Sequence, residues 1–239
     1  MNIRNRQGEI LDHAFHEAER KGVLVVIAHG LTGEKDRPLS IGLAERLQAR
    51  GWPSVRLSYS GNGKSEGKFT DSTITKEVDD LHSLLDQVKG TDKIVYIGHS
   101  MGGAVGALAT AKDDRINVLV SLAGMVNTKK FCEAEFGDVV PDQGCMWEDE
   151  EFPLSQEFVT DLHLIENTLM AARDVRSPWL IIHGDKDDVV LPQDSKDLFL
   201  TLRGKKKHLV LEGADHSFEG FYDQLIEEID AWLTLHVKK

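Results

Sequence analysis

The chain has 239 residues, of which 28 are lysine or arginine and 40 are aspartate or glutamate, giving a formal net charge of −12. With 41% hydrophobic residues it is long enough to bury the core of one ordinary globular domain, which excludes a disordered or collagen-like chain. The acidic balance argues against a nucleic-acid partner, because such proteins need surplus lysine and arginine to displace counterions from phosphates.

Six short runs rich in valine, isoleucine and leucine predict strands over residues 23–28, 54–57, 93–98, 118–122, 179–183 and 208–211. Between them, segments of helical period predict helices over residues 38–50, 73–88, 100–111, 193–202 and 218–236. Continuous apolar runs are typical of parallel strands that are covered on both faces. The alternation predicts the α/β class, with a mostly parallel central sheet and helices on both faces.

One connection is far longer than the others. Residues 125–176 separate two predicted strands by about 50 residues, whereas most connections span only a few. We expect this segment to be a small cap inserted into a core formed by residues 1–124 and 177–239. It carries 12 acidic and 4 basic residues, a net −8, and eight large apolar residues that we expect to form mostly its own core: Phe131, Phe136, Val139, Val140, Met146, Trp147, Phe152 and Phe158.

The two cysteines, Cys132 and Cys145, form no CxxC motif and no Cys/His cluster, so neither a disulfide nor a structural metal site is predicted. The first ten residues are polar and charged, and no run of 18 apolar residues occurs. We therefore expect a cytoplasmic protein without membrane insertion. The sequence makes no prediction of the oligomeric state.

Residues 98–102 (GHSMG) have the form G-x-S-x-G, between a predicted strand and a predicted helix. A serine at such a turn is held in strained backbone geometry, and side chains two residues before and after it would collide unless both are glycine. The helix N-terminus also offers free N–H groups to a developing anion. Ser100 is therefore the candidate nucleophile, with an ordinary glycine-rich turn as the structural alternative.

A serine nucleophile needs a base, and the base needs an acid that orients it. His216 lies in the loop after the last predicted strand, and Asp187 lies just beyond the strand at 179–183. Both follow the carboxyl ends of strands, where open α/β sheets build their sites. His216 is therefore the predicted base and Asp187 the predicted acid.

Other histidines and aspartates compete for these roles. His29, His99, His183 and His208 each adjoin a predicted strand, where a structural histidine is the commoner interpretation. Asp185 and Asp188 flank Asp187 in the same turn, and either could replace it as the acid or only cap the turn. We interpret Asp215, next to His216, as part of the loop structure.

Acyl transfer also needs donors for the oxyanion. The strand at 23–28 runs into a glycine-flanked turn, HGLTG at 29–33, which can direct the Leu31 N–H at the carbonyl under attack. The second predicted donor is the N–H of Met101, directly after the nucleophile. The structural alternative for residues 29–33 is an ordinary tight turn. Because the glycines around Lys64 miss both common phosphate-loop patterns, no nucleotide cofactor is predicted.

Four motifs together make the chain resemble the α/β-hydrolase superfamily: HGLTG at 29–33, GHSMGG at 98–103, HGDKDD at 183–188 and GADHSF at 213–218. The order Ser100, Asp187, His216 is also that of this superfamily. Residues 56–78 resemble the serine-aminopeptidase-like branch, which includes small bacterial feruloyl and cinnamoyl esterases and monoacylglycerol lipases. That branch often has R-G-H-G where this chain has Ser60-Gly61-Asn62-Gly63.

The resemblance implies a serine hydrolase whose cap roofs the triad and selects the substrate. It makes the partner a small-molecule ester and requires no metal or organic cofactor. The large apolar and aromatic side chains of the cap favour moderately apolar or aromatic esters, and its acidic surplus favours neutral over anionic substrates. The alternatives are a thioesterase or a peptidase or amidase on the same triad, and a non-catalytic binding protein with the same fold.

Overall fold

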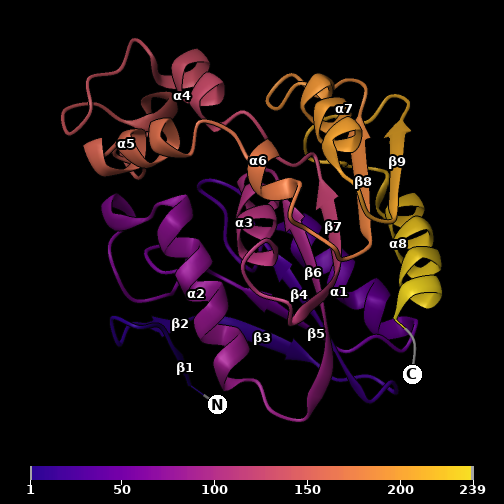
Figure 1. Ribbon diagram of the computed structural model, residues 1–239. Coiled ribbons are helices and arrows are strands. Elements are labelled where there is room, and N and C mark those ends of the chain that lie inside the picture. Colours follow the sequence, from indigo (N-terminus) through magenta and orange to yellow (C-terminus); the bar gives the residue numbers. More distant parts are fainter. Residues whose placement is uncertain (1, 238–239) are drawn as a thin grey trace.

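The computed structural model describes residues 2–237, which form a central seven-stranded sheet with helices on both faces (Figure 1). Its strand order is β3-β5-β4-β6-β7-β8-β9, and every neighbouring pair is parallel except β3 with β5. The bounds are β3 (His13–His16), β4 (Gly22–Ala28), β5 (Ser54–Leu57), β6 (Thr91–His99), β7 (Ile116–Leu122), β8 (Trp179–Gly184) and β9 (Lys206–Leu211). The prediction of an α/β protein with a mostly parallel sheet is confirmed.

The six predicted strands correspond to β4–β9. The sequence patterns did not indicate β3, nor the small antiparallel pair β1 (Ile3–Arg4) and β2 (Ile10–Leu11). These strands are short, and β3 is a partly exposed edge strand with the sequence HAFH. Because they are short, and because β3 is partly exposed, they lack the continuous apolar run by which the inner strands are recognised.

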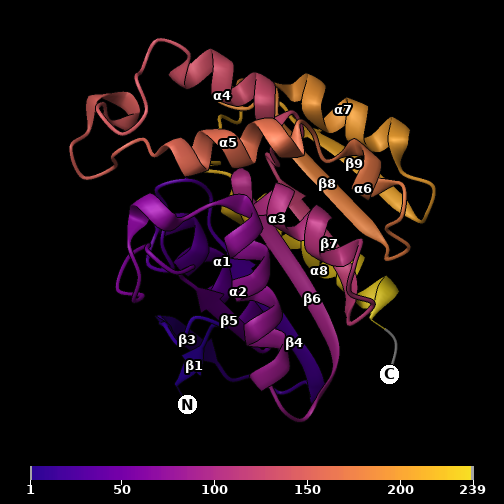
Figure 2. The ribbon, with the colours of Figure 1, turned by 60° about the vertical axis from the view of Figure 1, so that its left-hand side comes forward.

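Two apolar layers enclose the sheet, formed where the helices seen on either side of it in Figure 2 pack against its faces. One contains α1 (Pro38–Ala49) and α8 (Tyr222–His236), and the other contains α2 (Ile74–Gln87), α3 (Met101–Thr110) and α7 (Pro192–Thr201). Apolar residues recur along α2 at three- and four-residue steps, and Val78, Leu81 and Leu84 of this stripe are buried in its layer. Helix burial on both sides explains why the inner strands are apolar on both faces.

Segment 125–176 forms α4 (Thr128–Phe136), the 3₁₀ turn η2 (Met146–Glu148), α5 (Gln156–Ile165) and α6 (Leu169–Ala172), with α4 and α5 at the top of the view in Figure 1. The short turn η1 (Phe69–Asp71) packs beneath α5, where Phe69 meets Phe152 with ring centroids 5.1 Å apart. Of the large apolar residues in the segment, Phe136, Met146 and Phe158 are buried, whereas Val140 and Trp147 expose 57% and 46% of their surface.

The register of the parallel strands brings several turns to one edge of the sheet. Ala28, the last residue of β4, pairs with Gly98, and His99 at the end of β6 pairs with Leu122 at the end of β7. The segments that follow β4 and β6 therefore leave the sheet side by side. Among residues 2–237, no helix combines the length and the apolar composition that crossing a membrane requires.

Helix α2 buries the carboxyl group of Glu77, whose effect on the free energy of unfolding should depend on pH. Glu77 is 1% exposed, one of its oxygens has no hydrogen-bond partner, and the other accepts a long hydrogen bond of 3.4 Å from Ser72. Burial and the charge of Asp80 raise the pKa of Glu77 well above its usual 4.5. As pH rises through 4.5, the unfolded chain releases this proton and the folded chain retains it, so Glu77 lowers the free energy of unfolding.

Glu77→Gln is therefore expected to raise the melting temperature at pH 8, and the gain should shrink toward zero as pH falls to 4. Thermal unfolding of both proteins between pH 4 and 8 measures the difference. Glu227→Gln, at an exposed position of α8, is the matched control and should show little effect. A Glu77→Gln effect of the same size at every pH would contradict the assignment.

Candidate active site

Ser100 occupies a strained turn between β6 and α3. Its backbone angles are φ 54° and ψ −122°, a conformation that L-residues rarely adopt. Three backbone hydrogen bonds hold the turn: Ser100 N–H donates to Leu122 at 3.0 Å, and Ser100 C=O accepts from Gly103 at 2.8 Å and Met125 at 2.9 Å. These hydrogen bonds fix the backbone of the turn and with it the direction in which the Ser100 side chain leaves the backbone.

Two glycines allow the chain to pass close to Ser100. A Cβ at Gly102 would lie 2.5 Å from the carbonyl oxygen of His29, and one at Gly30 would lie 2.7 Å from the Cβ of Ser100. A Cβ at Gly98 would collide with the Gly102 carbonyl. The glycine pattern around the serine is therefore a steric requirement of this turn.

The structure joins Asp187 and His216 directly. His216 Nδ1 lies 2.8 Å from Asp187 Oδ2, and since an ionised carboxylate only accepts, Nδ1 carries the proton and donates. The other carboxylate oxygen, Oδ1, accepts from the N–H groups of Val189 at 3.0 Å and Val190 at 2.9 Å. Asp187 is 4% exposed. This arrangement fixes the tautomer of His216 and leaves its Nε2 free to accept a proton.

A second histidine, His183, also contacts Asp187. The fully buried His183 places Nε2 3.1 Å from Asp187 Oδ2 and 2.8 Å from the carbonyl oxygen of Val190. Burial alone would raise the pKa of Asp187, but the hydrogen bonds from His183 and His216 outweigh it and hold that pKa well below its usual range. Asp187 therefore stays ionised. Sequence reasoning gave His183 only a structural role and did not indicate this contact.

His99, at the end of β6, holds the loop that carries His216. Its Nε2 donates to the backbone carbonyl of His216 at 2.8 Å, and the two rings lie 4.7 Å apart. Burial, together with the neighbouring His216, lowers the pKa of His99 to about 3. A neutral His99 therefore adds no positive charge next to His216.

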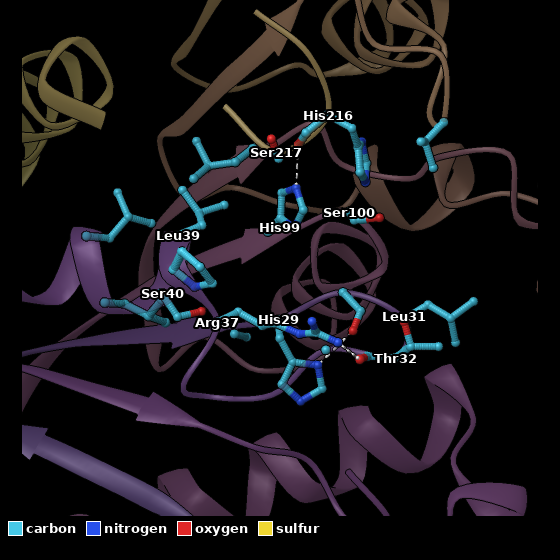
Figure 3. Close-up of a pocket in the computed structure, with 18 of the residues that line it drawn as sticks. His29, Leu31, Thr32, Arg37, Leu39, Ser40, His99, Ser100, His216 and Ser217 are labelled. Carbon is cyan, nitrogen blue, oxygen red and sulfur yellow. Dashed lines mark hydrogen bonds between the residues drawn. The ribbon is translucent and has the colours of Figure 1, made fainter. Parts of the chain in front are cut away.

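Ser100 and His216 line one pocket with a volume of about 670 Å³. Figure 3 shows His216 above Ser100, Leu31 and Thr32 below it, and Leu39 and Ser40 on the opposite side, while Arg37 reaches across to donate to the Thr32 carbonyl at 2.8 Å. Within residues 2–237, the Ser100 hydroxyl makes no hydrogen bond, so the structure brings Ser100 and His216 to the same pocket without joining them directly. Hydrogen bonds of this kind often tighten only when substrate is bound.

Two backbone N–H groups near Ser100 are unused. Within the described range 2–237, neither Leu31 N–H nor Met101 N–H donates to an oxygen atom. Leu31 lines the pocket, and Met101 begins α3, where the first N–H groups have no partner inside the helix. Both groups are available to a developing oxyanion.

His29 determines which way the Leu31 N–H points. Tyr59 N–H donates to His29 Nε2 at 3.1 Å, so Nδ1 carries the proton and donates to the Gly30 carbonyl at 2.7 Å. The same carbonyl accepts from Gly33 N–H at 3.0 Å. Because the peptide between Gly30 and Leu31 is trans, fixing its carbonyl points its N–H the opposite way. Sequence reasoning missed this role, since its signal is a contact with residue 59.

Burial also keeps His29 neutral. It is 3% exposed, and burial lowers its pKa to about 4, with the hydrogen bond to Gly30 acting against this shift and the charge of Arg37 adding to it. At neutral pH the ring therefore carries a single proton, which stays on Nδ1. At that pH the orientation of the Gly30 carbonyl is fixed.

The sequence predicts that the Leu31 N–H binds the oxyanion, and on that prediction His29→Phe should lower kcat by up to about 100-fold with KM little changed, because such a donor acts in the transition state. His29→Asn should recover part of this loss, since its amide nitrogen is attached at the same position as ring Nδ1. Steady-state kinetics on p-nitrophenyl acetate separate the two constants. A rise in KM with unchanged kcat would contradict the positioning role.

The competing residues have other partners. Asp185 accepts from Gly213 N–H at 2.6 Å, and Asp188 is exposed. Asp215 accepts from the N–H and hydroxyl of Ser217, as expected for a loop carboxylate. His208 Nε2 lies 3.0 Å from the Ser195 hydroxyl. Within residues 2–237, no three His, Cys, Asp or Glu side chains converge into a group that could hold a metal ion.

Comparison with known proteins gives the family and the fold. The family model for serine aminopeptidase, S33, matches residues 19–141, more than half of the chain. The chain is 26% identical to the protein YfhR of Salmonella typhimurium, covering 92% of this chain and 74% of that protein. It is 24% identical to the mitochondrial palmitoyl-protein thioesterase ABHD10 of Mus musculus, covering 93% and 82%.

Among solved structures, Est1E of Butyrivibrio proteoclasticus with bound ferulic acid superimposes with a TM-score of 0.90 at 23% identity, covering 100% of both chains. Mouse ABHD10 superimposes with a TM-score of 0.80 at 19% identity, covering 98% of each chain. These similarities confirm the predicted α/β-hydrolase fold. The relatives include ABHD10, described as a thioesterase, and a protein of Mycoplasma genitalium described as a putative esterase/lipase. The chain belongs to the serine aminopeptidase S33 family of α/β-hydrolases.

Proposed function

We propose that the protein is a serine hydrolase that cleaves carboxylic esters through an acyl-enzyme intermediate. The observation that carries this proposal is the hydrogen bond between Asp187 and His216, which leaves His216 Nε2 as an acceptor in the pocket that Ser100 also lines. The roles of Ser100, His216 and Asp187 in the reaction are part of the proposal.

In the proposed reaction, Ser100 Oγ attacks the ester carbonyl while His216 Nε2 takes its proton. The negative charge that develops on the carbonyl oxygen is bound by the N–H groups of Leu31 and Met101. Protonated His216 then gives its proton to the leaving alcohol, and the C–O bond to the alcohol breaks. Water, deprotonated by His216, attacks the acyl group, which releases the acid and restores Ser100.

The pocket favours small, neutral, moderately apolar or aromatic esters. Leu31, Phe131, Trp147 and Val189 provide apolar wall, and a pocket of this volume buries most of a small ligand. Segment 125–176, which we propose is the cap, supplies two of these residues. Its surplus of acidic residues gives a field that disfavours anionic substrates.

A panel of p-nitrophenyl esters with aryl, cinnamoyl and graded aliphatic acyl groups tests the proposal. We expect measurable kcat/KM for several members, because His216 Nε2 is placed to accept the proton of Ser100. A protein that is folded but hydrolyses no member of the panel would contradict the proposed activity.

Thioester hydrolysis is the second candidate, because the relative ABHD10 is described as a palmitoyl-protein thioesterase. The same serine, histidine and oxyanion donors would act, with a thiol as the leaving group. Matched oxygen and sulfur esters of one acyl group distinguish the two. A kcat/KM at least tenfold higher for the thioester would favour the second candidate.

A further inference from the structure

A second cavity adjoins the candidate active site. It is a groove of about 250 Å³ between α4 and the segment that joins β8 to α7, and Figure 1 shows α4 and α7 at the same end of the molecule. The groove and the active-site pocket share three lining residues, Phe131, Glu135 and Val189. These residues form a partition between the two spaces.

The partition draws its residues from two parts of the chain, α4 and the segment between β8 and α7. Phe131 and Glu135 lie one turn apart on the same face of α4, and Val189 follows Asp187 by two residues. Glu135 is held by a hydrogen bond from Trp147 Nε1 at 2.7 Å, and the Phe131 ring meets Phe136 edge-on at 6.0 Å. The bulk of the partition is therefore the phenyl ring of Phe131 and the side chain of Val189.

The groove beyond the partition presents mainly apolar surface. Its apolar lining comprises Met125, Ala134, Val190 and Leu191, and Leu191 exposes 62% of its surface. The carboxylates along the groove already have partners: Asp194 accepts from the N–H groups of Val126 and Asn127, and Asp197 accepts from Gln193. A hydrocarbon chain lying there would leave no buried carboxylate unpaired.

We propose that this groove is a latent extension of the substrate pocket and that Phe131 sets the length of the linear aliphatic substituent that the enzyme accepts. The inference rests on the proposed esterase function. Either the acyl chain or the alcohol chain of a bound ester points beneath α4, and the Phe131 ring stops that chain at the partition. Removing the ring joins the pocket to the groove and admits a longer chain.

The test is Phe131→Ala, assayed with two series of linear esters from two to twelve carbons, one varied in the acyl group and one in the alcohol. In one series the preferred length should increase by several carbons. Each methylene that leaves water for the groove should raise kcat/KM by roughly fourfold relative to the wild type. Val189→Ala opens the partition from the other side and should shift the same series in the same direction.

Two further variants separate the groove from a general loosening of α4. Phe152→Ala removes a ring of the same size from segment 125–176, but Phe152 lines neither space and should leave the length profile unchanged. Ala134 lines the groove but not the active-site pocket. Adding Ala134→Phe to Phe131→Ala should therefore fill the groove and cancel the increase in preferred chain length.

The inference is overturned if neither Phe131→Ala nor Val189→Ala changes the preferred length in either series, or if Phe152→Ala changes it equally. Failure of the proposed function looks different, because the wild-type protein would then hydrolyse none of the short esters in either series.

Discussion

Replacing Ser100 by alanine is expected to lower kcat for ester hydrolysis by about 10⁴- to 10⁶-fold. The hydroxyl is the only group that the variant removes, and the Cβ that defines the strained turn is retained. The three backbone hydrogen bonds of the turn do not involve the side chain, so the fold should remain intact. Turnover of p-nitrophenyl butyrate by purified protein, with a melting curve for each variant, measures both properties.

Ser217 provides the control, because it is another serine that lines the same pocket. Its hydroxyl donates to Asp215, so Ser217→Ala should retain most of the activity. If Ser100→Ala kept more than a tenth of the wild-type turnover while remaining folded, another nucleophile would have to be sought.

Asp187→Asn is expected to lower kcat at neutral pH by about 10⁴-fold. The N–H groups of Val189 and Val190 would keep the asparagine oxygen at the present position of Oδ1. Its NH₂ group would then face His216 Nδ1, which could only accept. The His216 proton would move to Nε2, and the ring could no longer take a proton from Ser100.

The neighbouring aspartates give two matched controls in the same turn. Asp185→Asn and Asp188→Asn carry the same chemical change, but their carboxylates do not contact His216 in the structure. Both should keep activity within about an order of magnitude of the wild type, a far smaller change than loss of the orienting acid produces. A larger loss in either variant than in Asp187→Asn would show that the acid has been misassigned.

Much of the fold could be predicted from local patterns. The inner strands β4 to β9 carry continuous apolar runs because helices cover both of their faces, and those runs marked their positions. The edge strand β3 has no such run, since its pairing with β5 and not its own sequence makes it a strand. The length of the connection between β7 and β8 indicated additional structure in segment 125–176, but its sequence did not define the positions of its helices.

In the candidate site, too, some residues could be predicted from the sequence and some contacts could not. Ser100, Asp187 and His216 each follow a strand, so their sequence positions indicated that they meet at one edge of the sheet. The contact of His183 with Asp187 and the tautomer of His29 depend on atoms that the fold brings together, such as the N–H of Tyr59. The partition likewise depends on the fold bringing Phe131 of α4 and Val189 to the same two cavities, which no local pattern encodes.

The central claim is that Ser100 is a nucleophile activated by His216, and covalent labelling with a fluorophosphonate tests it most directly. Attack by Ser100 Oγ on phosphorus with loss of fluoride would leave a stable phosphonyl serine. Peptide mass spectrometry is predicted to locate the adduct on Ser100, and His216→Gln should slow its formation by at least tenfold. An adduct on Ser40 or Ser217 of the same pocket, or no adduct on a folded protein that hydrolyses esters, would contradict the account.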